Sequence, residues 1–405
     1  MKRARRDLRR QDGTEAGDRV STVELFFDLV FVFAVTQLSH GLIAHLTWTG
    51  VLETAILLFA VWWFWNYTVW ATNWLNADTQ PVRWMLISLM LVSLLMSTSI
   101  PEAFGDRALM FALAYTVMQI ARCAFVVIAL RHHNRPVSIT MLRAGLWFVA
   151  SAPFWIIGAV DRDNQVAWWL LAIVIEFIAP MLRYRLPVLG AASYESIRVS
   201  GHHMAERSSL FVIIALGESI LATGTGFSEG DFEVATVLAF LGAFIGTILL
   251  WLLYFRRSAE KNAESLSTSA NSGRLARLSF TYLLVIVVAG IVVVAVGDEL
   301  VLHHPLGHLE ASTALIVTGG PALYLAGSLF FKRSIGYHWL ASHILAIVAL
   351  AITLVACLAL HPEWMTPLAL TWVTNAILLG VVIADEFGHR RHEKSAVAAG
   401  RTLIS

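Results

Sequence analysis

Residues 21–42 read STVELFFDLVFVFAVTQLSHGL, a stretch long and apolar enough to cross a membrane as one helix. Two carboxylates, Glu24 and Asp28, stand in its first two turns. Ser21 with Glu24 three residues later is the pattern of a capping box, which is the structural interpretation of Glu24. Asp28 has no basic residue three or four positions away, so it needs a partner on another helix or water. Its role is either structural or functional.

The rest of the chain repeats this apolar pattern. Of its 405 residues, 58% are hydrophobic and 14% are charged, and the mean hydropathy is +0.69. Apolar runs of membrane length predict an all-α, polytopic transmembrane bundle. We expect about twelve spans by this criterion, at 22–46, 51–74, 83–100, 107–130, 139–160, 165–183, 203–225, 232–255, 277–300, 311–331, 336–360 and 365–386.

The distribution of basic residues predicts the orientation of these spans. With the N-terminus inside, all but three of the 29 Lys and Arg residues fall on inner segments. The exceptions are Arg107 and Arg162 on outer loops and Arg122 within a span. The positive-inside rule therefore predicts that both ends are cytoplasmic. The polar N-terminus is too long for a cleavable signal peptide, so the first span is expected to be an uncleaved anchor.

The inner segments divide the chain into five predicted parts: a basic cytoplasmic tail (1–20), a first six-helix half (21–183), a cytoplasmic connecting loop (184–202), a second six-helix half (203–387) and a second basic tail (388–405). A 6+6 layout is compatible with a parallel repeat, and chance similarity explains the few residue matches equally well. Beside a membrane, basic tails are expected to contact anionic lipid and not nucleic acid.

Two buried charges in the first half call for partners. Arg122 lies about 13 Å from the inner end of its span at 1.5 Å per residue, too deep to reach the surface easily. Asp28 and Glu176 enter from the same side at similar depth, so we predict that Arg122 pairs with one or both. Pro180 removes the backbone hydrogen bond to the Glu176 carbonyl. A free carbonyl beside a carboxylate suits a cation or proton, although a partner helix or water would also satisfy it.

The second half opens with AERSSLFVIIALGESILATG (205–224). Glu218 lies near mid-span, and Gly217 beside it would let another backbone approach closely. A carboxylate at that depth is a functional candidate by default. Asp28, Arg122, Glu176 and Glu218 are therefore the predicted ion or substrate pathway.

Three further patterns have a structural and a functional interpretation. Gly319, Gly320 and Pro321 predict a broken or kinked helix in span ten, which is either a packing kink or part of a transport site. One face of span two carries polar and aromatic side chains, which either pack against helices or line a cavity: Trp62, Asn66, Trp70 and Asn73. His40 and His343 are candidate proton-handling groups.

No motif of a nucleotide-binding, hydrolase or metalloprotease site is present. The histidines lack zinc-site spacing. Both cysteines, Cys123 and Cys357, lie in apolar runs, so neither a disulfide framework nor a thiolate metal site is expected. We therefore expect that the protein is not an enzyme and that it binds neither a cofactor nor a metal ion.

Two stretches carry a family resemblance: VELFFDLVFVFAVTQLS (23–39) and AERSSLFVIIALGES (205–219). They resemble the signature stretches of the bacterial low temperature requirement protein A (LtrA) family, and the resemblance extends over nearly the whole chain. It implies a multi-pass protein of the bacterial cytoplasmic (inner) membrane that is required for growth in the cold. It assigns no catalytic residues. The positions that the resemblance emphasises are Glu24, Phe27, Asp28, Glu206, Gly217 and Glu218.

Three functions compete. The first is a secondary transporter or ion-translocating protein that uses the buried carboxylates, with a proton or small cation as the coupling ion. The second is a membrane sensor or structural protein that supports envelope function in the cold and does not transport. The third is an intramembrane enzyme acting on lipid, for which no nucleophile–base pair is visible.

Overall fold

The computed structural model describes residues 8–10, 19–193, 199–229, 232–268, 275, 277–335, 341–360 and 364–398, with residues 229, 257–268 and 388–398 described by their backbone alone. Every regular element in these residues is helical. Two isolated bridges, Arg9 with Leu75 and Leu186 with Gly190, are the only extended pairings in that part of the chain. The predicted all-α fold is confirmed.

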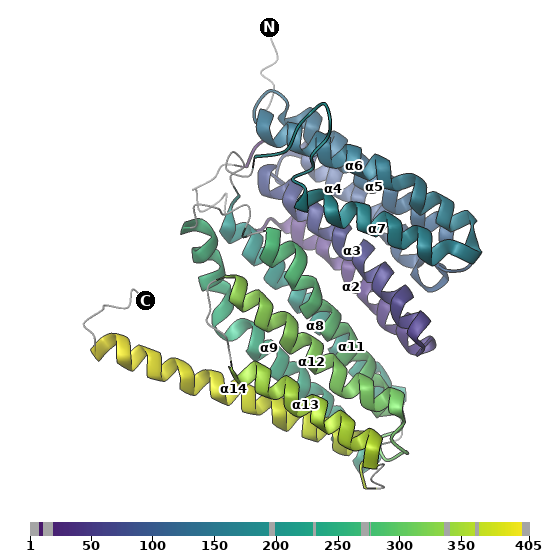
Figure 1. Ribbon diagram of the computed structural model, residues 1–405, viewed down its shortest axis with the longest axis vertical. Coiled ribbons are helices and arrows are strands. Elements are labelled where there is room, and N and C mark those ends of the chain that lie inside the picture. Colours follow the sequence, from purple (N-terminus) through teal and green to yellow (C-terminus); the bar gives the residue numbers. More distant parts are fainter. Residues whose placement is uncertain are drawn as a thin grey trace. The chain divides into compact units, whose positions relative to one another are not determined.

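Twelve helices in the described residues are long and apolar enough to cross a membrane, as predicted. The main helices are α2 (Thr22–Ala44), α3 (Trp48–Trp74), α4 (Gln80–Thr98), α5 (Ala108–Leu130), α6 (Arg135–Val160), α7 (Gln165–Met181), α8 (Gly201–Glu229), α9 (Val234–Thr268), α11 (Leu284–His303), α12 (Ala311–Ser334), α13 (Ala341–Leu360) and α14 (Pro367–Ala398). Short 3-10 turns lie at η1 (Ile100–Glu102) and η2 (Arg162–Asn164), and a π-helical segment, η3 (Arg277–Leu283), leads into α11. Figure 1 labels these helices and colours them by their position in the sequence, from purple to yellow.

The helix ends follow local sequence signals. Ser21 caps α2, and the Thr47 hydroxyl accepts a hydrogen bond from Gly50 N at the start of α3. The Asn134 side chain caps α6 in the same way by accepting from Val137 N. Each cap satisfies a backbone N–H that a helix start leaves free. At the other extreme, α9 runs 13 residues past the predicted end at 255, because the polar residues that follow do not break a helix.

The chain forms two compact units. Residues 1–214 and 259–285 make up the first unit, and residues 215–258 and 286–405 make up the second. The first contains α2–α7, the start of α8, the end of α9 and η3, while the second contains the remainder of α8, α9 up to residue 258, nearly all of α11, and α12–α14. The division into halves at 21–183 and 203–387 stays a prediction.

Helix α3 is the centre of the first unit, where it packs against α2, α5 and α7. Trp62, Trp63 and Trp65 are almost completely buried. The Trp62 indole N–H donates to the Thr281 carbonyl (2.8 Å), and the Asn66 amide donates to the Phe280 carbonyl (2.9 Å). Both carbonyls belong to the π-helical segment η3, where helix hydrogen bonding is locally irregular. The polar face of α3 therefore bonds to η3. Of the two interpretations of this face, the structure supports helix packing.

Helix α12 in the second unit is continuous through Gly319, Gly320 and Pro321, so a broken helix is wrong, while the alternative of a kink stays a prediction. Gly320 has a packing role instead, because a Cβ there would lie 2.9 Å from Val294 N on α11. Gly290 on α11 approaches Tyr324 in the same manner, with 2.5 Å between a built Cβ and Tyr324 N. Small residues allow two membrane helices to pack closely.

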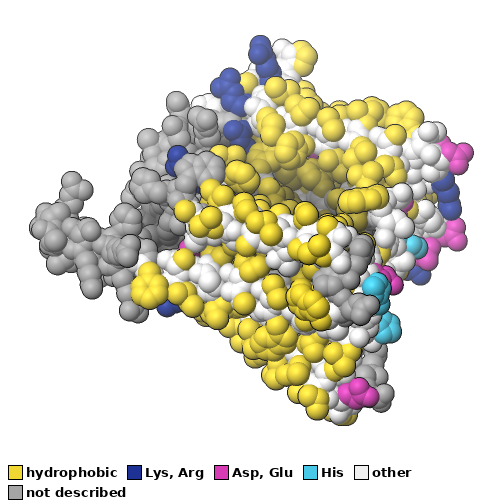
Figure 2. All heavy atoms as spheres, turned by 60° about the horizontal axis from the view of Figure 1, so that its bottom comes forward, with side chains coloured by type: hydrophobic (Ala, Val, Ile, Leu, Met, Phe, Trp, Pro, Cys, Tyr) yellow, Lys and Arg dark blue, Asp and Glu magenta, His cyan; other side chains and the backbone are white. Residues whose placement is uncertain are grey.

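The outer surface fits a membrane protein. Figure 2 shows hydrophobic side chains over the flanks of the helices seen in that view, with most charged side chains towards the edges. Many large apolar side chains are exposed on helices, among them Phe26, Leu91 and Ile128. Exposed apolar area on this scale marks contact with lipid or another apolar phase. The chain is therefore a multi-pass membrane protein.

Candidate functional site

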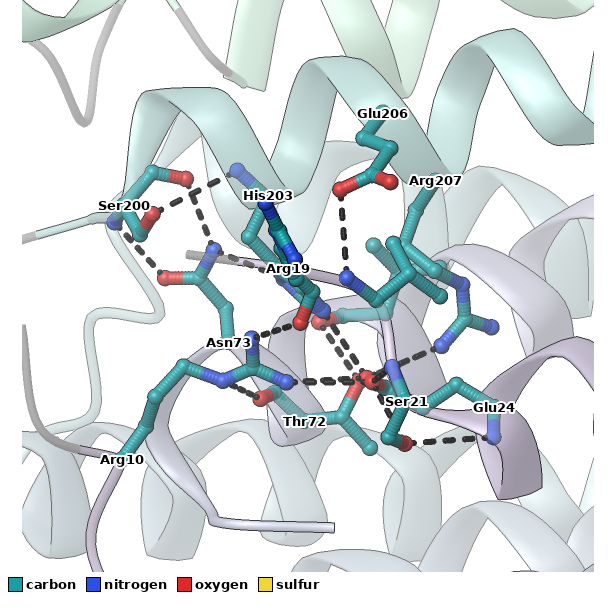
Figure 3. Close-up of polar contacts among 12 residues, drawn as sticks. Arg10, Arg19, Ser21, Glu24, Thr72, Asn73, Ser200, His203, Glu206 and Arg207 are labelled. Carbon is teal, nitrogen blue, oxygen red and sulfur yellow. Dashed lines mark hydrogen bonds and ion pairs between the residues drawn. The ribbon is translucent and has the colours of Figure 1, made fainter. Parts of the chain in front are cut away.

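The candidate site is a group of charged side chains at the start of α2, which we call the charged cluster: Arg10, Glu24, Asp28, His203 and Arg207. Figure 3 labels four of them, Arg10, Glu24, His203 and Arg207. All of its members lie in the first unit. Glu24 and Asp28 come from the first two turns of α2, and His203 and Arg207 come from the first two turns of α8. Residues four apart share a helix face, so one face of α8 presents both basic side chains.

Glu24 forms the predicted capping box. Its Oε2 atom accepts hydrogen bonds from Ser21 N and Ser21 Oγ, both at 2.9 Å, and the Ser21 hydroxyl accepts from Glu24 N. The cap is only part of its environment. His203 Nε2 lies 2.8 Å from Glu24 Oε1, and Arg207 Nη1 lies 3.1 Å from the same oxygen. The prediction that Glu24 caps α2 is confirmed, and the same carboxylate also contacts His203 and Arg207.

Arg10 reaches the cluster because its backbone is held against the end of α3. Arg10 N donates to the Trp74 carbonyl (3.0 Å), and its Nε donates to the Thr72 carbonyl (3.0 Å). Its Nη2 then lies 3.1 Å from Glu24 Oε2. This arginine belongs to the predicted lipid-binding tail, 1–20, yet its guanidinium is buried in the protein. In the remainder of that tail, residues 8, 9, 19 and 20 are described, and 1–7 and 11–18 lie outside the described residues.

Asp28 pairs with Arg207 and not with Arg122. Arg207 Nη2 donates to Asp28 Oδ1 at 2.6 Å, and the Trp65 indole N–H donates to the same oxygen at 2.8 Å. The Asp28 side chain is 2% exposed. Its second oxygen, Oδ2, has no hydrogen-bond partner among the described residues. Arg207 therefore bridges both carboxylates of α2, and one carboxylate oxygen is left free.

The hydrogen bonds around His203 define its tautomer. The Asn73 amide nitrogen lies 3.3 Å from His203 Nδ1 and also donates to the Ser200 carbonyl (2.9 Å). The Asn73 oxygen accepts from Ser200 N, so the amide orientation is fixed. An NH₂ group can only donate, so Nδ1 is the acceptor and Nε2–H donates to Glu24. With neutral His203, two carboxylates face two guanidinium groups.

Arg122 forms no ion pair among the described residues, which corrects the predicted pairing. Its guanidinium donates to the Phe64 carbonyl (3.1 Å) and the Thr68 hydroxyl (3.2 Å) on α3, and to Gln119 Oε1. It also lies 5.4 Å from the centroids of the Phe64 and Tyr67 rings, within cation–π range. Carbonyl, hydroxyl and ring contacts thus replace the expected carboxylate.

Glu176 is held by three neutral donors. Tyr115 OH donates to Oε2 at 2.5 Å, while Ser151 Oγ (2.7 Å) and Trp155 Nε1 (2.9 Å) donate to Oε1. Gln119 Nε2 donates to Tyr115 OH at 2.9 Å, and the same amide accepts from Arg122. Arg122 and Glu176 are therefore joined through Gln119 and Tyr115 without touching.

Glu218 lies in the second unit, on the later part of α8, and is 1% exposed. The prediction that Gly217 allows a close approach is wrong, because no described atom outside the local helix lies within 4 Å of a Cβ built there. Of the four predicted pathway residues, Arg122 and Glu176 share a hydrogen-bond chain, whereas Asp28 belongs to the charged cluster. The fourth motif carboxylate, Glu206, accepts a hydrogen bond from Val20 N (3.1 Å).

A second polar group occupies the second unit. Lys332 Nζ lies 3.6 Å from Asp385 Oδ2, and His343 Nδ1 lies 3.9 Å from Asp385 Oδ1. His343, a predicted proton-handling candidate, is completely buried beside Lys332. No set of three His, Cys, Asp or Glu side chains in the described residues is arranged to hold a metal ion.

The partners of the two α2 carboxylates are what sequence reasoning missed: Arg10, Trp65, His203 and Arg207. One signal in the sequence could have found two of these partners. His203 and Arg207 are four residues apart, so they share one face of α8, the helix that carries the second family-like stretch. Arg207 also lies only a few residues from the polar 184–202 segment, which suggested a position at the surface. Its guanidinium is instead fully buried.

A sequence model described as "Bacterial low temperature requirement A protein (LtrA)" matches residues 19–383. An uncharacterised protein of Rhizobium meliloti (strain 1021) is 36% identical over 381 residues, which cover 93% of this chain and 91% of the relative. No solved structure matches this chain significantly. The matched range includes every member of the charged cluster except Arg10.

Proposed function

This chain belongs to the bacterial low temperature requirement A family, and we propose that it is a secondary transporter or ion-translocating protein in which Asp28 reversibly binds a proton or small cation. The single observation that carries this proposal is the free Oδ2 atom of Asp28. A buried carboxylate oxygen without a hydrogen-bond donor is costly in a low-dielectric interior, and binding a proton or cation removes that cost.

Protonation at Oδ2 is compatible with the observed geometry. Arg207 and Trp65 both donate to Oδ1, and this atom remains an acceptor when Oδ2 carries the proton. Arg207 keeps Glu24 as its second partner at 3.1 Å. Loading and release at Asp28 would thus change the strength of one ion pair that joins α2 to α8. Such a change is the kind of local event that can bias a conformational equilibrium.

The other pathway candidates have different environments. Both carboxylate oxygens of Glu176 already accept hydrogen bonds, from Tyr115, Ser151 and Trp155, whereas Asp28 Oδ2 accepts none among the described residues. We propose that it holds α5, α6 and α7 together and does not exchange ions. Glu218 stays a pathway candidate in the second unit on the basis of its burial.

Proteoliposome flux tests the proposal. Purified protein in vesicles containing a pH-sensitive dye, with a potential-sensitive dye in parallel, should dissipate an imposed proton or cation gradient. Asp28→Asn should abolish this response while the protein remains folded. Asp106→Asn is the matched control, because that carboxylate is 90% exposed. Unchanged flux in Asp28→Asn, or no flux with the wild-type protein, would overturn the proposal.

A structural or sensing role is the second candidate, and the environment of Glu24 favours it. Ser21, Arg10, His203 and Arg207 all bond to this one carboxylate, so it ties the segment before α2 and the end of α3 to α8. This candidate predicts that Glu24→Gln lowers thermal stability and growth in the cold together. It also predicts that vesicles containing the wild-type protein show no flux.

Location and orientation complete the proposal. Family membership and the distribution of Lys and Arg support a place in the bacterial cytoplasmic membrane with both ends inside. Contact between the basic tails and anionic lipid belongs to the same proposal. No catalytic motif supports an enzymatic activity.

A further inference from the structure

A cavity of about 310 Å³ lies at the end of α2 opposite the charged cluster. Its walls come from the last turns of α2, the first turns of α3, and η1 with the turn that follows it. All of these elements belong to the first unit. We propose that this cavity binds a small organic cation with an apolar body.

The charge of the cavity wall selects a cation. Glu53 and Glu102 line it together with His45, which interacts electrostatically with Glu53, and no Lys or Arg lines it. Neither carboxylate has an ion pair or a side-chain hydrogen bond within the described residues. Two arginines of this region have other partners, because Arg107 donates to the Thr98 carbonyl (2.7 Å) and Arg162 pairs with Asp106 (3.2 Å). Two carboxylates and one imidazole around one space leave an excess of negative charge when His45 is neutral, and this excess favours a positively charged occupant.

The remaining lining selects an organic ligand over a metal ion. Leu38, Leu57 and Phe104 provide apolar wall, and the Phe104 ring packs on Trp169 at 4.9 Å between centroids. The volume is at the lower end of the range of about 300–1,000 Å³ for small-molecule sites. No described set of three metal-ligating side chains exists here or elsewhere. An ammonium group beside Glu53 with its carbon body against Phe104 would use both kinds of wall.

Two glycines define the geometry of the site. A Cβ at Gly50 would lie 2.0 Å from the His45 carbonyl, so the tight turn between α2 and α3 requires glycine. Gly41 lines the cavity, and nothing lies within 4 Å of a Cβ built there. A larger side chain at Gly41 would therefore occupy open space at the cavity without a clash. Gly41→Leu is thus a way to fill the site from its wall.

The proposal rests on the cavity and not on the proposed ion translocation at Asp28. Binding is measured on the full-length protein in nanodiscs, with phenethylammonium as the probe. Its neutral counterpart, 2-phenylethanol, has the same ring and chain length. We expect saturable binding of phenethylammonium and binding of 2-phenylethanol at least tenfold weaker, because a hydrogen-bonded charge contributes about one factor of ten or more.

The variants locate the site. Glu53→Gln and Glu102→Gln should each weaken phenethylammonium binding, Glu53→Gln by about tenfold, and Gly41→Leu should do so at least as strongly. Glu310→Gln, at an exposed helix cap in the second unit, is the control for the carboxylates. Gly380→Leu, an exposed glycine with nothing within 4 Å, is the control for bulk. Both controls should bind within twofold of wild type.

Three results would overturn the inference: equal affinity for the cation and the alcohol, unchanged affinity in all three cavity variants, or no saturable binding. A cooperative thermal unfolding transition shows that each variant is folded. If Gly41→Leu does not fold, the two Glu→Gln variants are enough to test the inference. Asp28→Asn separates the two proposals. It should retain cation binding at the cavity even where ion flux is lost.

Discussion

Removing Arg207 should destabilise the protein more than removing the carboxylate it pairs with. Among the described residues, Arg207 is the cation that contacts both Glu24 (3.1 Å) and Asp28 (2.6 Å). In Arg207→Met, Asp28 keeps only the Trp65 indole as a donor. Breaking a buried ion pair by removing one partner costs about 3–5 kcal/mol of unfolding free energy. We expect a loss in that range.

Asp28→Asn should cost less because Arg207 keeps its bond to Glu24. An asparagine oxygen can still accept from Trp65 and from Arg207, so the expected loss is about 1–3 kcal/mol, the range for one charge-assisted hydrogen bond. The double variant should lose less than the sum of the single losses, since the uncompensated carboxylate is then absent. Contacting residues typically show such coupling, at about 0.5–3 kcal/mol.

The assay is denaturant-induced unfolding in mixed micelles, followed by tryptophan fluorescence. Trp65 bonds directly to Asp28, so its emission also reports on the cluster. Arg162→Met is the matched control, because its ion pair with Asp106 has side chains that are 53% and 90% exposed. That loss should be no more than about 1 kcal/mol. If Arg207→Met costs no more than Asp28→Asn, Arg207 is not the compensating charge for both carboxylates.

Three further predictions test other parts of the structure. Tyr115→Phe removes the hydroxyl that donates to Glu176 and accepts from Gln119, so it should cost about 1–3 kcal/mol in the same unfolding assay. Ser228→Ala, at an exposed hydroxyl, is the control and should cost almost nothing. Equal effects would contradict the bonding described for Glu176. Gly320→Ala should destabilise the protein by about 1–3 kcal/mol because its Cβ clashes with Val294. The adjacent Gly319→Ala is the control and should not destabilise it, because nothing lies within 4 Å of a Cβ there. A neutral Gly320→Ala would contradict the close packing of α11 and α12. The Asp163→Cys variant should react with a membrane-impermeant maleimide in intact cells, and Arg131→Cys should react only after permeabilisation. The background should be low because native Cys123 and Cys357 are buried. The reverse pattern would contradict cytoplasmic ends.

The arginines show why part of the site could not be predicted. Arg122 and Asp28 lie at similar depths from the same side, so depth alone suggested that they pair. In the structure, Arg122 points at the α3 backbone and Gln119, while Asp28 meets Arg207 from α8. Depth follows from the rise per residue along one helix. The choice of partner depends on which helices are neighbours and how each is rotated, and the apolar pattern of an almost uniformly hydrophobic helix carries little of that information.

Local chemistry in the sequence determined the spans and several helix ends, since membrane length, apolar composition and the Ser21–Glu24 capping box act within one segment. It also singled out Glu24 and Asp28 as the carboxylates that needed an explanation. Only the tertiary structure decided that Arg207 compensates both of them and that Gly320 serves packing in an unbroken α12. It alone also decided that Asp28 Oδ2 has no hydrogen-bond partner among the described residues. The physical reason is that buried charges and close-packed glycines are satisfied by atoms from other helices, and those contacts form only when the helices have packed together.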